Sequence, residues 1–188
     1  VDPISGVLNM PAFSIAYAKV MSQGELPLAA LWYVDIHSFR SVNPNFGYLA
    51  GNHVLRSLAD GVREIVCGEL PITRLGADRF VFLSTGLDED AAQRAFSELG
   101  TYLREHAGEH GVNRGLELTG GIYYLRESDY ASESFSRALD YASIAHRNAK
   151  AEGRGVLMHF SNEDLERDMR RIVIEQSIDD ALANSQIE

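Results

Sequence analysis

Two aspartates occupy positions from which they could act together on one ligand. Asp35 lies near the end of a nearly continuous apolar run, residues 28–36 (LAALWYVDI), and Asp78 lies in the short segment 76–78 between two further apolar runs. If these runs are neighbouring strands, both carboxylates and a backbone carbonyl could hold Mg²⁺, a cation that takes oxygen ligands and keeps waters that a phosphate can displace. The spacing by itself equally fits a solvated loop aspartate and a turn-forming aspartate.

Hydrophobic periodicity predicts the elements that would position these residues. Helices are expected at 11–23, 54–66, 89–105 and 132–150, and strands at 28–36, 72–75, 79–83, 116–125 and 156–160. Residues 37–47 (HSFRSVNPNFG) are expected to form a polar loop, and Gly120-Gly121 predicts a bulge or a close backbone approach. The order β-α-β-β-α-β, with flanking additions, predicts a ferredoxin-like α+β fold with a central, mostly antiparallel sheet wrapped by helices.

Composition limits the class of partner. The 188 residues include 45% hydrophobic and 23% charged residues, which is typical of one globular domain. With 17 Lys and Arg against 27 Asp and Glu, the net charge is −10, which disfavours nucleic acid and anionic membrane surfaces as partners. An anionic ligand would therefore need a metal or a local basic cluster. A lone cysteine, Cys67, excludes an intramolecular disulfide and favours the cytoplasm, and no apolar run approaches the ~20 residues of a membrane span.

Five segments of the sequence carry recognisable motifs. They are RLGADRF (74–80), DPISGVLN with Phe13 (2–13), VDIHSFRSVN (34–43), the segment 47–55, and AHRNAKAEGR (145–154). The first resembles a degenerate form of the signature of GGDEF domains, the diguanylate cyclases that join two GTP molecules into cyclic di-GMP. The others resemble the family's D-x-L-T-G-L-x-N-R-x-x-F, D-I-D-x-F-K-x-I-N, G-H-x-x-G-D-x-V-L and A-x-x-x-A-K-x-x-G-R segments. The resemblance covers about residues 2 to 160.

This resemblance implies a set of site residues. The metal, Mg²⁺ bound with GTP, would be held by Asp35, Asp78 and the carbonyl of Ile36. The nucleotide would be bound by Asn43 and Asn52 at guanine, by Phe39 and Arg40 of the 34–43 motif, and by Lys150 and Arg154 near the phosphates. The last two residues also fit a simpler role, since basic residues near a helix C-terminus complement its dipole.

Departures from the family pattern concentrate on the chemistry. The signature is Gly76, Ala77, Asp78, Arg79, Phe80, so that a cation replaces the glutamate and a methyl group is added at the second glycine. Positive charge beside the metal ligands would disfavour Mg²⁺, and Asn52 in place of an aspartate would weaken guanine recognition. No catalytic residue is therefore expected, and synthesis of cyclic di-GMP is expected to be lost.

Three further positions also depart from the family. Cys67 and Leu70 stand where family members carry the R-x-x-D of an inhibitory product site, so feedback binding of cyclic di-GMP is not expected. His37 replaces the second aspartate of D-I-D and is expected to be a loop or partly packed histidine rather than a metal ligand.

Residues 161–188 differ in character from the rest. The stretch 165–184 (LERDMRRIVIEQSIDDALAN) resembles the helical connector that leads from a GGDEF domain to an EAL domain, the cyclic di-GMP phosphodiesterase. We therefore expect a GGDEF-like domain over 1–160 and a connector over 161–188, in a longer chain whose upstream part could carry a membrane tether. The expected role is GTP binding or regulation of the adjoining EAL domain. Two alternatives stay open: a weak diguanylate cyclase acting as a homodimer, and a ligand-free dimerisation module.

Overall fold

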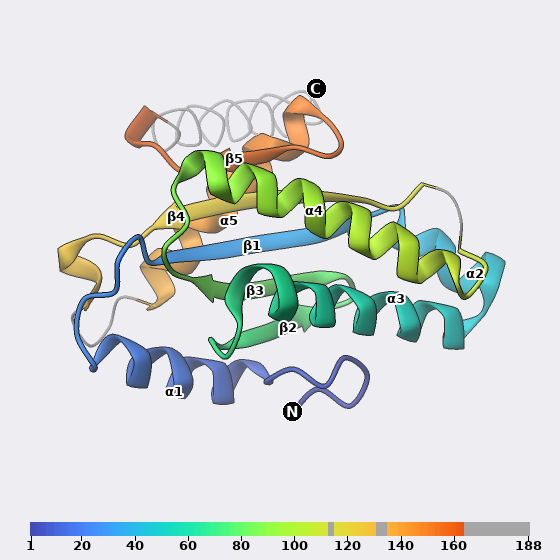
Figure 1. Cartoon of the computed structure of the whole chain (residues 1–188), viewed down its shortest axis with the longest axis horizontal. Coiled ribbons are helices and arrows are strands. Elements are labelled where there is room, and N and C mark those ends of the chain that lie inside the picture. Colours follow the sequence, from blue (N-terminus) through green and yellow to red (C-terminus); the bar gives the residue numbers. More distant parts are fainter. Residues whose placement is uncertain (113–114, 131–134, 164–188) are drawn as a thin grey trace, which may run out of the picture.

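Strand β1 (Ala30–His37) lies at the centre of a five-stranded sheet of order β2-β3-β1-β4-β5 in a computed structural model (Figure 1). The structure describes residues 1–112, 115–130 and 135–163. The other strands are β2 (Ile72–Gly76), β3 (Arg79–Ser84), β4 (Glu117–Tyr124) and β5 (Leu157–His159). The helices are α1 (Met10–Met21), α2 (Val42–Phe46), α3 (Tyr48–Gly61), α4 (Glu89–Gly108) and α5 (Phe135–Glu152).

The connectivity confirms the predicted fold. Elements β1, α3, β2, β3, α4 and β4 form the β-α-β-β-α-β core, and α1, α5 and β5 are additions to it. Strand β1 pairs antiparallel with β3 and β4, β2 pairs antiparallel with β3, and only β5 is parallel to its neighbour β4 within the described sheet. Of the two alternatives predicted at Gly120-Gly121, a bulge is not found, since the β1–β4 register is continuous.

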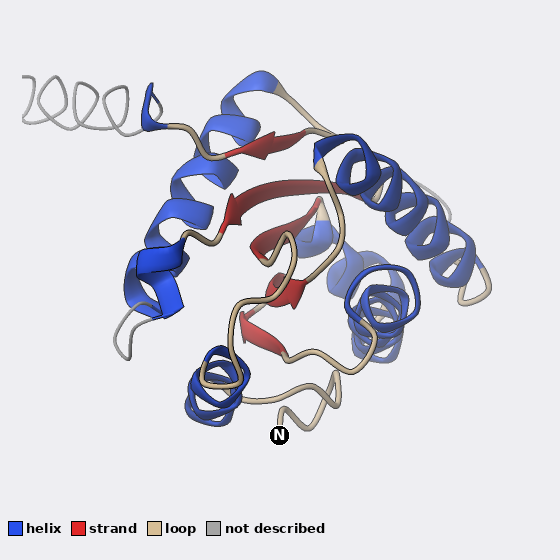
Figure 2. Ribbon diagram, turned by 60° about the vertical axis from the view of Figure 1, so that its left-hand side comes forward, coloured by secondary structure: helices blue, strands red, loops and turns tan. Residues whose placement is uncertain are grey.

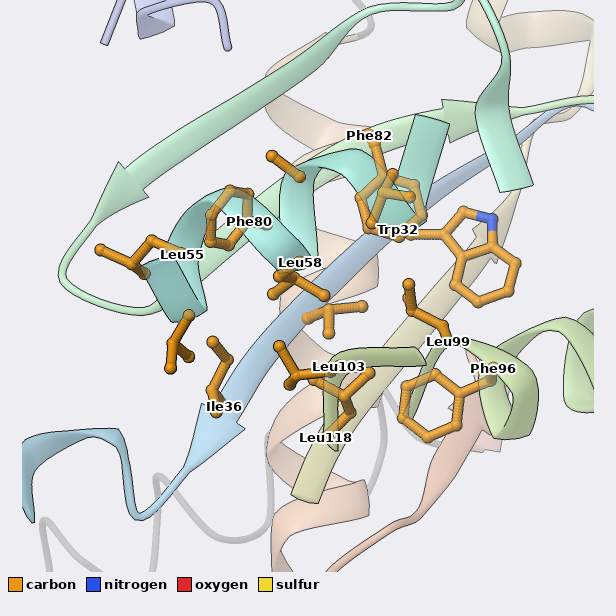
Figure 3. Close-up of a cluster of buried hydrophobic side chains, with 14 of the residues drawn as sticks. Trp32, Ile36, Leu55, Leu58, Phe80, Phe82, Phe96, Leu99, Leu103 and Leu118 are labelled. Carbon is orange, nitrogen blue, oxygen red and sulfur yellow. The ribbon is translucent and has the colours of Figure 1, made fainter. Parts of the chain in front are cut away.

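Side chains of β1 alternate between two hydrophobic layers, because successive residues of a strand point to opposite faces. Trp32, Val34 and Ile36 pack with α3 and α4, and Figure 3 shows this core around Trp32, Leu58 and Leu99. Leu31 and Tyr33 pack on the other face, which α1 and α5 cover (Figure 2). Asp35 continues this second series, so its carboxylate faces the α5 side of the sheet.

Helix α5 approaches β4 very closely at Gly121. A Cβ atom added there would lie 2.2 Å from the backbone N of His146 and 2.3 Å from the backbone O of Ala142. The close backbone approach predicted from Gly120-Gly121 is therefore confirmed, and its cause is the helix that packs on the strand. The contact fixes the height of α5 above the sheet.

The segment after β1 is more helical than predicted. Residues 37–47 contain a 3₁₀ turn (Phe39–Ser41) and α2 instead of a loop, and the helix expected from residue 54 begins at Tyr48. Pro44 lies in the first turn of α2, where no intrahelical hydrogen bond is lost. Gly47, with φ of 85°, separates α2 from α3. Residues Val62–Cys67 then form a π-helical turn, which is why α3 ends before the predicted boundary.

Both outer strands have little free edge. Beside β2, the N–H of Leu8 donates to the carbonyl of Ile72 at 3.0 Å, and Oγ1 of Thr73 donates to the carbonyl of Leu8 at 2.9 Å. At the opposite edge, β5 has only three residues. The predicted connector helix lies outside the described residues except for its first residues, up to Glu163. Among the helices described, none has the length and hydropathy required to cross a bilayer.

A buried carboxylate ties the end of β4 to α5. Asp129 is fully buried, accepts from the hydroxyl of Tyr123 at 2.6 Å and the N–H of Arg126 at 2.8 Å, and pairs with the guanidinium of Arg137 at 2.6 Å. Burial by itself raises the pKa of Asp129, but the three hydrogen-bonding partners outweigh it, and the pKa lies below its ordinary value.

The Gly121 contact predicts a large difference between two Gly→Ala substitutions. Gly121→Ala should lower the free energy of unfolding by about 1–3 kcal/mol, because the methyl group overlaps the α5 backbone. Gly100→Ala in α4 is the control, since its nearest neighbour would be the flexible end of Arg104 at 3.4 Å and alanine favours helix. Urea denaturation monitored by circular dichroism measures both. Equal stabilities of the two variants would contradict the close approach.

Asp129 predicts a pH-dependent contribution to stability. A lowered pKa in the folded state means that the stabilisation is present above the unfolded pKa and is lost as the pH falls through the folded pKa. Asp129→Asn should therefore destabilise by about 2–4 kcal/mol near pH 7, and the gap to the unmodified chain should shrink towards pH 3. Urea denaturation at both pH values measures it, with the exposed Asp140→Asn as control. A gap independent of pH would contradict the assignment.

Candidate functional site

One pocket of about 500 Å³ collects most of the predicted site residues. It lies where β1 ends beside the turn between β2 and β3, and Lys150 of α5 closes one side. Its lining consists of Asp35, Ile36, His37, Ser38, Phe39, Arg40, Ala77, Asp78, Arg79 and Lys150. Asn43, Asn52 and Arg154, predicted to bind the nucleotide, do not line this pocket, and Phe80 of the signature is fully buried in the α3–α4 layer.

Asp35 is the buried charge of the pocket. Its side chain is 4% exposed, and its Oδ2 pairs with Nζ of Lys150. Its Oδ1 lies 3.2 Å from Nε2 of His146, at an angle outside hydrogen-bond geometry. Burial by itself raises the pKa of Asp35, but the contacts with His146 and Lys150 outweigh it, so that the pKa lies below its ordinary value. The carboxylate is therefore held in its charged form by two basic residues of one helix.

Asp78 has the opposite environment. Burial raises the pKa of its carboxyl group, and the negative charge of Asp35 adds to the rise, which a backbone hydrogen bond, Lys150 and Arg79 only partly offset. Asp35 and Asp78 both line this pocket, so the turn and the end of β1 meet there. Their role at a metal is not shown by this proximity.

The turn that carries Asp78 has an unusual backbone. Ala77 has φ of 47° and Gly76 has φ of 132°, and both values lie in the region that favours glycine. The pairing of β2 with β3 shifts between Arg74 and Gly76, so the strand is irregular just before the turn. Arg79 begins β3 directly opposite Asp35 in the β1–β3 register, and its side chain lines the pocket.

Positive charge predominates in the pocket of this acidic chain. Arg40, Arg79 and Lys150 line it together with two carboxylates. The pocket therefore contains the local basic cluster that an anionic ligand would need in a chain of net charge −10. His37, half-buried, also lines it.

The donor groups of the pocket, as they are arranged, do not fit the expected Mg²⁺. Mg²⁺ needs several oxygen ligands in octahedral geometry. Both oxygens of Asp35 face basic side chains, which leaves Asp78 as the other carboxylate that lines the pocket, beside Ile36. Across the described ranges, no three His, Cys, Asp or Glu side chains cluster closely enough to hold a metal. We therefore assign no step to a metal ion.

Asn43 has an unsatisfied acceptor. Its Oδ1 is buried and has no hydrogen-bond partner among the described residues. The atom lies against α3, because a Cβ added at Gly51 would be 2.0 Å from it. Asn52 is the next residue of α3 and is half-buried. Their role at guanine stays a prediction.

The positions of the family's inhibitory site lie elsewhere. Leu70 lines a second cavity of about 470 Å³ beside β2, together with Asp60, Glu64 and Glu69. Cys67 is 5% exposed, and burial raises the pKa of its thiol to about 12, so it is a buried, unreactive residue. The expected loss of feedback binding stays a prediction.

His146 is a pocket-side residue that sequence reasoning missed. It is 6% exposed at the side chain and packs on the ring of Tyr33 at a centroid distance of 4.7 Å. It precedes Lys150 by four residues, a spacing that places both side chains on one face of a helix. This i,i+4 spacing could have linked His146 to Lys150 from the sequence. It does not indicate which strand the helix face that carries them contacts.

The fold is a ferredoxin-like domain with a pocket, lined by both basic and acidic side chains, between the end of its central strand and a hairpin turn. The chain belongs to the GGDEF family, because the family model described as "Diguanylate cyclase, GGDEF domain" matches residues 1–156. The family assignment agrees with the motifs quoted above.

Relatives and solved structures agree with this assignment. The cyclic di-GMP phosphodiesterases NbdA of Pseudomonas aeruginosa and PdeR of Escherichia coli are 23% and 24% identical to the chain, of which they cover 100% and 99%. The chain spans only 24% and 28% of their own lengths. The GGDEF domain of TpbB (YfiN) from Pseudomonas aeruginosa shares the fold, with a TM-score of 0.73 over 89% of this chain and 98% of that chain at 21% identity.

The positive φ of Ala77 predicts a stabilising substitution. Ala77→Gly should raise the free energy of unfolding by up to about 1 kcal/mol, because glycine relieves the left-handed strain and loses part of the gain through unfolded-state entropy. Exposed Ala18 in α1 serves as control, since Ala18→Gly should destabilise that helix by about 1 kcal/mol. Thermal denaturation measures the stability of both variants against the unmodified chain. Destabilisation by Ala77→Gly would show that the turn does not adopt this backbone conformation.

Proposed function

We propose that this GGDEF domain of cyclic di-GMP signalling binds GTP in the pocket, does not join two GTP molecules, and regulates an adjoining phosphodiesterase domain. The main support for this proposal is the position of Arg79. This residue lies opposite Asp35 in the sheet and lines the pocket at the position of the signature glutamate. A guanidinium there can bind phosphate oxygens but cannot accept a proton from a reacting hydroxyl. Arg79 thus favours binding of GTP and does not favour the joining of two GTP molecules.

Three features support GTP as the ligand. Arg40, Arg79 and Lys150 supply positive charge around a pocket large enough for a phosphate chain. The buried Oδ1 of Asn43 lacks a partner among the residues described and could accept from the N–H groups of guanine after a local rearrangement. Family membership makes GTP the nucleotide of choice.

The regulatory part of the proposal is supported by the relatives. NbdA and PdeR are named as phosphodiesterases of cyclic di-GMP, and this chain matches only about a quarter of each. The stretch 165–184 has the charge pattern of a connector to an EAL domain. GTP would act on that neighbour only if it binds two states of the domain with different affinity.

A ligand-free dimerisation module is the second candidate. Phe46, Tyr48 and Leu49 are 47%, 79% and 77% exposed around the junction of α2 and α3, and exposed apolar groups mark interaction surfaces. The weak cyclase alternative lacks such a supporting observation, because Arg79 takes the place of the glutamate.

Calorimetric titration of the 188-residue chain with GTP in MgCl₂ tests the proposal. We expect a micromolar Kd, about −8 kcal/mol, and no cyclic di-GMP when the mixture is separated by nucleotide chromatography. The matched variant Arg79→Ala should bind GTP about tenfold more weakly, because a charged hydrogen bond to phosphate is lost. Arg94→Ala, an exposed arginine of α4 outside the pocket, is the control.

The other outcomes of this titration are also decisive. A cyclic di-GMP peak would support the cyclase, and the double variant Ala77→Gly with Arg79→Glu should then enlarge it. Absence of heat with GTP, together with concentration-dependent dimerisation, would support the ligand-free module and overturn GTP binding.

A further inference from the structure

The α5 face that carries His146 and Lys150 occupies the position where a divalent cation would bind Asp35. Nζ of Lys150 pairs with Oδ2, and Nε2 of His146 lies 3.2 Å from Oδ1, so each carboxylate oxygen is next to a nitrogen of α5. We propose that Lys150 is the built-in counter-ion of Asp35 and that the pocket accepts a nucleoside triphosphate without a divalent cation. This inference rests on the proposed function, of which it specifies the binding mode.

Burial makes the counter-ion necessary. The Asp35 side chain is 4% exposed, and an isolated carboxylate so deeply buried would be strongly destabilising. Lys150 reaches it from an exposed position, with 51% of its side chain accessible. Its ammonium group thus neutralises Asp35 from the pocket side, where an incoming cation would otherwise bind.

The position of α5 is fixed by the sheet. The helix rests on Gly121 so closely that a Cβ there would overlap the helix backbone, including the backbone N of His146. His146 packs on Tyr33, two residues before Asp35 on the same face of β1. The imidazole therefore fills the space beside Oδ1, and Lys150, one helical turn later, covers Oδ2.

The remaining charges favour a metal-free anion. With Lys150 engaged by Asp35, Arg40 and Arg79 still line the pocket, and Asp78 is the other carboxylate there. Arginine forks suit phosphate oxygens directly, without a bridging cation. The charge that Mg²⁺ usually supplies to a triphosphate is provided by these side chains.

Calorimetry of GTP binding in EDTA and in MgCl₂ tests the inference. We expect Kd values within about threefold of each other in the two buffers. Weakening by more than about thirtyfold in EDTA would overturn metal-independent binding while leaving GTP binding intact. Absence of binding in both buffers would instead overturn the proposed function.

Substitution of Lys150 separates a counter-ion from a simple phosphate ligand. Lys150→Met should weaken GTP binding about tenfold in EDTA, and MgCl₂ should restore it, because Mg²⁺ can then reach Asp35. An equal loss in both buffers would overturn the counter-ion role. Lys150→Arg should keep binding independent of metal, which shows that the site tolerates substitution.

The lysine content allows a test without nucleotide. The chain has two lysines, Lys19 in α1 and Lys150, so that ¹⁵N-lysine NMR should give two side-chain signals. Lys19→Met identifies the Lys150 signal and is the control for binding. Millimolar MgCl₂ should leave both signals unchanged. A selective shift of the Lys150 signal would show that Mg²⁺ displaces the ammonium group and would overturn the inference, whether or not GTP binds.

Discussion

A buried carboxylate must have positive charge beside it, and in this domain that requirement falls on Asp35 at the end of the central strand. The strand alternation directs Asp35 to the α5 layer, so the compensating groups have to come from α5. They reach it because α5 lies directly on the glycine of β4. The charge at Asp35, the close contact at Gly121 and the character of the pocket are consequences of one packing arrangement.

Most of the fold could be predicted from the sequence. The apolar runs around Trp32 and Phe82 identified the central strands, and the order of elements identified the ferredoxin-like core. The exceptions are local. Pro44 and Gly47 suggested a loop, but a proline in a first turn and a glycine between two helices are compatible with helices on either side. The π-helical turn after Gly61 has no periodicity signal of its own.

The site was predictable only in part. Asp35 and Asp78 could be paired only on the condition that their strands are neighbours, which the family resemblance implied and which the pairing of β1 with β3 meets. His146 could not be placed, because its contact with Asp35 depends on how a helix is set across the sheet. Sequence motifs also do not show that Asn43 and Arg154 lie outside the main pocket. Their functions stay predictions.

The short β5 and the Leu8–Thr73 pairing also affect how copies of this domain can meet. Exposed strand edges offer rows of unpaired N–H and C=O groups, which are templates for uncontrolled aggregation. One outer strand here is three residues long, and the other is partly paired by the N-terminal segment and irregular before its turn. Association by strand addition is therefore disfavoured. Any contact between copies of the domain would then have to use its helix and loop surfaces.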